Sequence, residues 1–112
     1  MNYCFDIDGT ITVETKGFGY TQYLNRTPKT EMIKIINKLM DEGNTIILYT
    51  SRFEEDEKVT KEWLKKHGVK YHMLKFNKIH YDYWIDDKAI NELVFRELKI
   101  KELTIGENDE II

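Results

Sequence analysis

Two aspartates, Asp6 and Asp8, stand one residue apart at the end of an apolar run in the segment FDIDGTI. Adjacent negative charges at the end of a buried strand are costly unless cations offset them. Polar side chains also follow or precede other apolar runs, namely Thr50, Ser51, Arg52, Lys78, Asp86 and Asp87. Carboxylates suit a hard divalent cation, and hydroxyl and ammonium groups suit the oxygens of a phosphoryl group. These residue types therefore indicate phosphoryl chemistry.

Alternating strands and helices are predicted to position these residues. Strands are expected at 2–5, 45–49, 69–74 and 82–85, with a short last strand at 101–105, and helices at 28–42, 54–67 and 88–98. This alternation predicts an α/β fold, Rossmann-like, with three αβα layers, a mainly parallel sheet and one domain over residues 1–112. Because parallel strands direct their carboxyl ends to one edge, the polar residues should meet there.

Local signals refine these elements. Thr27 is expected to cap the first helix, with Pro28 at its first position and Gly43 at its end. Residues 9–27 show no helical period and are read as an ordered loop or small hairpin. Cys4 is expected to belong to the buried part of the first strand.

A metal ion would make the acidic cluster tolerable. Four carboxylates in one crevice repel one another unless a cation lies among them. Oxygen ligands with room for water favour Mg²⁺ over zinc. The three histidines do not share the spacing of metal ligands.

The ordered set of motifs resembles the haloacid dehalogenase (HAD) superfamily of phosphohydrolases. The matching segments are DIDGT at 6–10, IILYTSR at 46–52, Lys78, and YWIDD at 83–87. Within that superfamily, the chain resembles small, nearly capless members, some of them capsular-polysaccharide biosynthesis phosphatases. One departure is Asn77-Lys78-Ile79, where related members tend to carry Gly-Lys-Pro, so Lys75 is kept as the alternative lysine.

The resemblance implies a role for each residue. Asp6 would be the nucleophile that forms an aspartyl-phosphate, and Asp8 would protonate the leaving oxygen and then deprotonate water. Thr50, with Ser51 as second choice, would donate to the phosphoryl group, and Lys78 would neutralise nucleophile and phosphate. The metal would be held by Asp6, the backbone carbonyl of Asp8, Asp86 and Asp87, with Asp86 the direct ligand and Asp87 beside it or one water away.

Arg52 and Asp87 each allow two interpretations. Arg52 either contacts substrate or pairs with the acidic run EEDE at 54–57. Asp87 either binds the metal or caps the third helix.

Composition limits the partners. The net charge of −3 gives no basic track for a nucleic acid, and the single cysteine suggests a reducing, cytoplasmic compartment without an internal disulfide. No apolar run has the ~20 residues that a membrane span needs. The leading hypothesis is therefore a magnesium-dependent phosphatase acting on a small phosphorylated metabolite such as a sugar phosphate or a nucleotide.

Other functions remain as alternatives. One is a polynucleotide end phosphatase, because capless superfamily members can accept polymers. Another is a non-catalytic, phospho-receiver-like signalling domain, although the third strand region HMLKFN offers no aspartate for phosphorylation.

The chain leaves little room for a lid over the site. The segments that follow the first two strands are too short to fold as a cap, which needs about 40 residues. The site should be open unless a neighbouring subunit of a homo-oligomer covers it. Phe18, Tyr20 and Tyr23 are expected to contact the leaving group.

Overall fold

The computed structural model describes the backbone of residues 1–111 and the side chains of residues 1–102. The chain divides into two compact units, Met1–His80 and Tyr81–Ile112, which are described here one at a time. That residues 1–112 form one domain stays a prediction.

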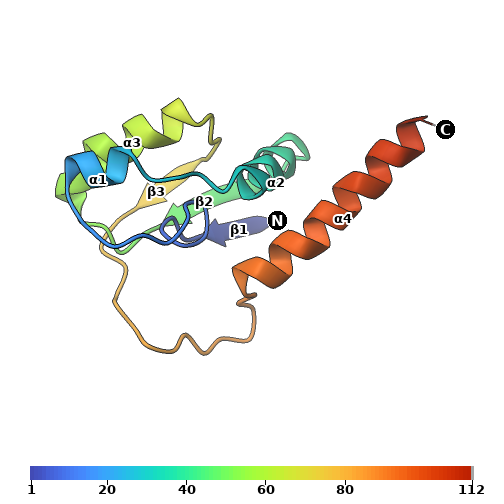
Figure 1. The fold of residues 1–112 in the computed structure, drawn as a ribbon. Coiled ribbons are helices and arrows are strands. Elements are labelled where there is room, and N and C mark those ends of the chain that lie inside the picture. The colour runs from blue at the N-terminus through green and yellow to red at the C-terminus, as the bar shows by residue number, and fades with distance from the viewer. Residues whose placement is uncertain (112) are drawn as a thin grey trace. The chain divides into compact units, whose positions relative to one another are not determined.

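The first unit is built on a three-stranded parallel sheet (Figure 1). Its strands are β1 (Asn2–Phe5), β2 (Thr45–Tyr49) and β3 (Met73–Lys75), in the order β1-β2-β3. The first two strands have the predicted bounds, and the third is shorter than predicted. The prediction of an α/β fold with a parallel sheet is confirmed.

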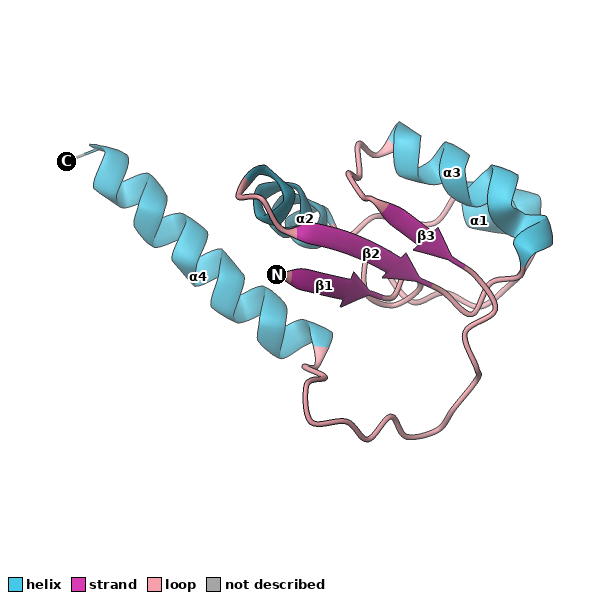
Figure 2. Ribbon diagram, turned by 180° about the vertical axis from the view of Figure 1, so that it is seen from behind, coloured by secondary structure: helices cyan, strands magenta, loops and turns pink. Residues whose placement is uncertain are grey.

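Helices connect these strands on one side of the sheet (Figure 2). The crossover from β1 to β2 carries α2 (Thr30–Asp41), and that from β2 to β3 carries η1 (Glu54–Asp56) and α3 (Glu57–Lys66). Right-handed crossovers in a sheet that grows in one direction place both helices on the same face. Residues buried beneath them form the core, including Ile36, Leu39, Ile46, Leu48, Val59, Trp63 and Leu64.

The segment between β1 and α2 is more ordered than a simple loop. It contains the short helix α1 (Tyr20–Leu24) and isolated bridges from Thr12 to Asp8 and Pro28. Pro28 therefore lies in an extended segment, and Lys29 precedes the first residue of α2. The expected Thr27 cap is wrong because this segment bonds to residues 11–13 instead, as Val13 N–H donates to the carbonyl of Thr27 at 2.8 Å.

Cys4 also differs from expectation, because its side chain is exposed rather than in the core. Successive residues of a strand point to opposite faces. Phe5 points into the core, whereas Cys4 lies on the other face of the sheet, in register with Ile47, which in turn is in register with Met73.

The second unit consists of an irregular segment followed by α4 (Glu92–Ile111). The strand predicted at 82–85 is not formed, and the last strand predicted at 101–105 is helical instead. α4 begins four residues later than expected, after Asn91, whose side-chain oxygen accepts a hydrogen bond from Leu93 N–H at 3.0 Å. Asp87 is therefore not the cap of this helix.

Within the described part of the chain, no helix combines the length and the apolar character that crossing a bilayer requires. The third layer of the predicted sandwich would need α4, which belongs to the second unit, so this layer stays a prediction.

Candidate active site

The carboxylate of Asp6 stands directly after β1 and pairs with a lysine. Its Oδ2 lies 3.2 Å from Nζ of Lys78, and its Oδ1 accepts a hydrogen bond from Ile7 N–H at 2.8 Å. The Lys78 side chain is only 9% exposed, whereas that of Asp6 is 35% exposed. The arrangement leaves Asp6 accessible to a substrate beside a nearly buried positive charge.

The loop after β3 brings Lys78 to this position. Lys78 N–H donates to the carbonyl of Thr50 at 2.9 Å, and Asn77 N–H donates to the carbonyl of Arg52 at 2.9 Å. Asn77 has a φ of 62°, the left-handed conformation that glycine adopts freely and asparagine tolerates. An asparagine can therefore serve where related sequences tend to carry glycine before the lysine.

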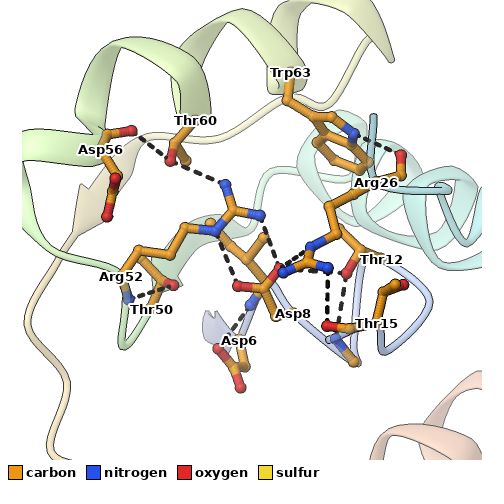
Figure 3. A network of polar contacts seen from close by, with 12 residues as sticks. Asp6, Asp8, Thr12, Thr15, Arg26, Thr50, Arg52, Asp56, Thr60 and Trp63 are labelled. Atoms are coloured by element: carbon orange, nitrogen blue, oxygen red, sulfur yellow. Dashed lines mark hydrogen bonds and ion pairs between the residues drawn. The ribbon is translucent and has the colours of Figure 1, made fainter. Parts of the chain in front are cut away.

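Asp8 is bound by a buried arginine from the next strand end (Figure 3). Arg52 donates from Nε to Oδ2 of Asp8 at 2.9 Å and from Nη2 to Oδ1 at 2.8 Å. Its third nitrogen, Nη1, donates to the Thr60 hydroxyl on α3 at 3.0 Å. The guanidinium also lies over the ring of Tyr23, 4.0 Å from the ring centroid. Such a two-pronged pair fixes the plane of the carboxylate.

These contacts bear on the two interpretations of Arg52. The guanidinium bonds to Asp8 and Thr60, and its side chain is only 1% exposed. Its ion pair is therefore formed with Asp8 and not with the acidic run at 54–57, which favours a role exerted through Asp8. Direct contact with a substrate stays a prediction.

A second arginine approaches the same carboxylate. Arg26 Nε lies 3.5 Å from Oδ1 of Asp8, and Figure 3 shows both guanidinium groups directed at this side chain. The Thr12 hydroxyl is also 3.5 Å from Oδ1 of Asp8. Asp8 thus lies among two positive charges and a hydroxyl, all within the first unit.

The end of β2 supplies the hydroxyl groups. Thr50 is buried, and its hydroxyl accepts a hydrogen bond from Arg52 N–H at 3.1 Å. A hydroxyl that accepts one bond can still donate its own proton. Ser51 is half-buried and therefore the more accessible of the two. Which of them would touch a phosphoryl group stays a prediction.

Cys4 and Tyr23 complete the surroundings without offering a better nucleophile. Desolvation raises the pKa of the Cys4 thiol, and the positive charge of Lys78 offsets part of this increase. Cys4 therefore stays a neutral thiol at neutral pH. Desolvation likewise raises the pKa of Tyr23, with Asp56 adding to it and Arg52 opposing it. Asp6, partly exposed and paired with Lys78, remains the candidate nucleophile.

Asp86 and Asp87 lie in the second unit. Asp86 accepts hydrogen bonds from Lys88 N–H at 2.8 Å and from the Trp84 indole at 3.4 Å. The bond from Lys88, followed by bonds from Asp87 and Trp84, lowers the pKa of Asp86. A carboxylate held in this charged form suits a metal ligand, but the parts of Asp86 and Asp87 in a metal site stay predictions.

The donor chemistry of the first unit fits Mg²⁺ in part. Asp6 offers a carboxylate that is partly exposed, and hard oxygen donors are the ligands Mg²⁺ prefers. Among the described residues, no group of three acidic, histidine or cysteine side chains is close enough to hold a metal. The first unit therefore supplies only part of a ligand set for Mg²⁺, and its completion stays a prediction.

The sequence interpretation missed Arg26 and Thr60. Neither belongs to a motif with fixed spacing, and both reach the site through tertiary packing. Arg26 lies just after α1, and the carbonyl of this residue accepts a hydrogen bond from the Trp63 indole of α3 at 2.8 Å. The run NRTPK around it carries no signal that an arginine there is buried.

Comparison with solved structures shows the same fold. The crystal structure of an MCSG target from Vibrio cholerae matches with a TM-score of 0.74 and 23% identity, over 97% of this chain and 98% of that chain. The structure of a Pnkp1/Rnl/Hen1 complex matches with a TM-score of 0.59 and 19% identity, over 88% of this chain and 33% of that chain. A Pnkp1/Rnl/Hen1 RNA repair complex matches with a TM-score of 0.58 and 19% identity, over 93% of this chain and 30% of that one.

The sequence itself also matches a family. No curated protein matches the chain. The model of the polynucleotide kinase PNKP phosphatase domain matches residues 1–105, which is nearly the whole chain. Together with the paired Asp6 and Asp8 at the end of β1, this match shows that the chain belongs to the PNKP-type phosphatase domains of the HAD superfamily and is a phosphoric monoester hydrolase.

Proposed function

We propose that this chain hydrolyses phosphomonoesters through a phosphorylated Asp6, with Mg²⁺ as cofactor. The observation that carries the proposal is the pairing of the partly exposed Asp6 with the nearly buried Lys78, 3.2 Å away, at the carboxyl end of a parallel sheet. Ligands of open α/β sheets bind at this edge.

Each residue has a step in the proposed reaction. A carboxylate oxygen of Asp6 attacks phosphorus and forms the aspartyl-phosphate, while the bond to the leaving oxygen breaks. Asp8 gives a proton to that oxygen and later takes one from the water that attacks the intermediate. Lys78 and a hydroxyl of Thr50 or Ser51 hold the phosphoryl oxygens. Asp6, the backbone carbonyl of Asp8, and Asp86 or Asp87 would hold the metal, which would supply positive charge to neutralise the phosphate.

For the substrate, we favour a small phosphorylated metabolite. In the described structure the segment after β1 forms only α1 and isolated bridges, which leaves no cap domain there to grip a larger leaving group. The net charge of −3 also opposes binding to a polyanion. The single cysteine supports a cytoplasmic location. A neighbouring subunit covering the site is part of the same proposal.

A polynucleotide end is the second candidate, because the matching family model is a polynucleotide kinase phosphatase domain. The two candidates differ in what lies beyond the phosphate. A small metabolite offers few remote contacts, whereas a polymer offers further phosphates whose binding depends on salt.

One comparison of substrates separates the candidates. We would measure kcat/KM in Mg²⁺ for sugar phosphates, nucleoside monophosphates and short oligonucleotides that carry the same phosphate at the 5′ or 3′ end. The main proposal expects the small substrates to match or exceed the oligonucleotides at every salt concentration. An oligonucleotide advantage of more than about tenfold that falls steeply with added salt would establish the polynucleotide end instead.

A further inference from the structure

We infer that Arg26 is a positioning residue that holds Asp8 in place for proton transfer and ties the segment 15–17 to it. This inference rests on the proposed function, because it assigns a task to Asp8 in that reaction. It concerns a residue outside every motif that the sequence analysis identified.

Each of the three nitrogens of the Arg26 guanidinium faces an oxygen atom. Nη1 donates to the carbonyl of Thr15 at 2.8 Å, and Nη2 donates to the carbonyl of Gly17 at 2.6 Å. Nε is left facing Oδ1 of Asp8 at 3.5 Å, the distance of an ion pair. The Arg26 side chain is only 4% exposed, so water screens this pair poorly.

The backbone of Arg26 is held as firmly as its side chain. Its carbonyl accepts the Trp63 indole bond at 2.8 Å, and its N–H donates to the carbonyl of Tyr23 at 3.3 Å. Trp63 is fully buried in α3, and the Tyr23 ring lies beneath the guanidinium at 5.3 Å. The helices α1 and α3 therefore fix the position of Arg26, and Arg26 in turn fixes the position of the Asp8 carboxylate.

Arg26 and Arg52 act on Asp8 in different ways. Arg52 grips both oxygens and sets the plane of the carboxylate. Arg26 faces Oδ1 only, and its other two nitrogens are engaged by the segment 15–17. Losing Arg26 leaves the bidentate pair intact, but removes the link that fixes Asp8 relative to the segment after β1. Displacement of a reacting group by about 1 Å can cost roughly 10²-fold in rate.

A purely structural arginine and a positioning arginine make different predictions about leaving groups. Proton donation by Asp8 matters for an alkyl phosphate, whose leaving oxygen is strongly basic. It matters little for 4-nitrophenyl phosphate, whose leaving oxygen is stable without a proton. A misplaced Asp8 must therefore slow the alkyl substrate more than the aryl substrate, because general acid catalysis contributes about 10²–10⁴-fold.

The experiment measures kcat/KM, which reports the leaving-group step and not the shared hydrolysis of the aspartyl-phosphate, for glycerol phosphate and 4-nitrophenyl phosphate in the full chain with Mg²⁺. The variants are Arg26→Gln, which removes the charge, and Arg26→Lys, which keeps the charge and most of the side-chain stem if the first variant fails to fold. We expect the ratio of alkyl to aryl kcat/KM to fall about tenfold or more in each variant, because glutamine lacks the charge and a lysine does not reproduce the planar fork that contacts three oxygens.

A matched control separates stability from positioning. Asn37 holds the turn after α3 by donating to the carbonyl of Gly68 at 2.8 Å and accepting from Lys70 N–H at 2.9 Å. Asn37→Ala should lower the melting temperature and leave the alkyl-to-aryl ratio unchanged. In a third variant, Arg26→Ala, which leaves space for a free guanidinium ion, adding that ion should restore part of the lost ratio, and sodium chloride at the same ionic strength should not.

The outcomes distinguish this inference from the function on which it rests. If Arg26→Gln and Arg26→Lys slow the two substrates equally, or leave the ratio at its wild-type value, Arg26 only anchors the loop and the inference is overturned. If the wild type hydrolyses neither substrate nor any other phosphomonoester, the proposed function itself fails and removes this inference with it.

Discussion

At the residue scale, Lys78 is the side chain whose contribution can be isolated most cleanly. It pairs with Asp6 at 3.2 Å, whereas Lys75 is exposed at the end of β3. We expect Lys78→Ala to cost roughly 2–4 kcal/mol of transition-state stabilisation, the scale of losing one preorganised electrostatic donor. Lys75→Ala should change kcat/KM by less than about threefold, since surface substitutions rarely exceed ~0.5 kcal/mol. Steady-state kinetics on both variants checks this, and a larger loss for Lys75 would reverse the assignment.

The sequence could predict which residues end the strands, but not which of their charges pair. The order of the motifs predicts that Lys78 neutralises Asp6, and the structure brings the two side chains into contact. The partners of Asp8 were not foreseen. Arg26 follows a five-residue helix that hydrophobic period does not reveal, and its burial depends on Trp63 of α3. Such contacts arise from tertiary packing, about which local spacing carries no information.

At the scale of elements, the three aromatic residues in and before α1 that are expected to contact a leaving group, Phe18, Tyr20 and Tyr23, differ in their burial. Tyr23 is buried beneath the two arginines, whereas Phe18 is 84% exposed. Tyr20 donates to Glu62 of α3, and that bond is the main reason its pKa is raised. Tyr23 therefore belongs to the packing of the site, while contact of Phe18 or Tyr20 with a leaving group stays a prediction.

We therefore expect different consequences from two substitutions in this segment. Tyr23→Ala should lower the free energy of unfolding by about 3–5 kcal/mol, as is usual when a buried aromatic is truncated. Phe18→Ala should leave stability within about 0.5 kcal/mol of the wild type. It should raise KM for the best substrate more than for a small aryl phosphate. Denaturant melts and kinetics check both statements, and equal effects of Phe18→Ala on the two substrates would make this segment purely structural.

The predicted elements succeed where the hydrophobic pattern is strong and local. TIILY forms β2 within its predicted bounds, and the apolar residues of α2 are buried as the 3.6-residue period requires. DYWI is as rich in strand-forming residues, yet it is irregular. A strand forms only where another strand accepts its backbone hydrogen bonds, and the described second unit contains no strand to do so. In the same unit, Asn91 sets the start of α4 in place of Asp87.

At the scale of the whole molecule, the proposed dependence on Mg²⁺ is open to a direct test. EDTA should abolish hydrolysis, and added Mg²⁺ should restore it, because the proposed reaction uses the metal to neutralise phosphate charge. Asp86→Ala should raise the Mg²⁺ concentration needed for half-maximal activity by about tenfold or more. Asp41→Ala, which removes a surface carboxylate paired with Lys70, is the control and should change nothing. Full activity after exhaustive chelation would exclude the metal from the reaction.

Every step of the proposed reaction depends on Asp6 as the group that becomes phosphorylated. The most direct measurement compares wild type and Asp6→Asn on 4-nitrophenyl phosphate in Mg²⁺, with circular dichroism to confirm that both are folded. An amide is a far weaker nucleophile than a carboxylate and cannot form the same acyl phosphate. We predict turnover by the wild type and none by the folded variant. Hydrolysis by Asp6→Asn within about tenfold of the wild type would contradict the account, because such a loss is far below what removing a covalent nucleophile costs.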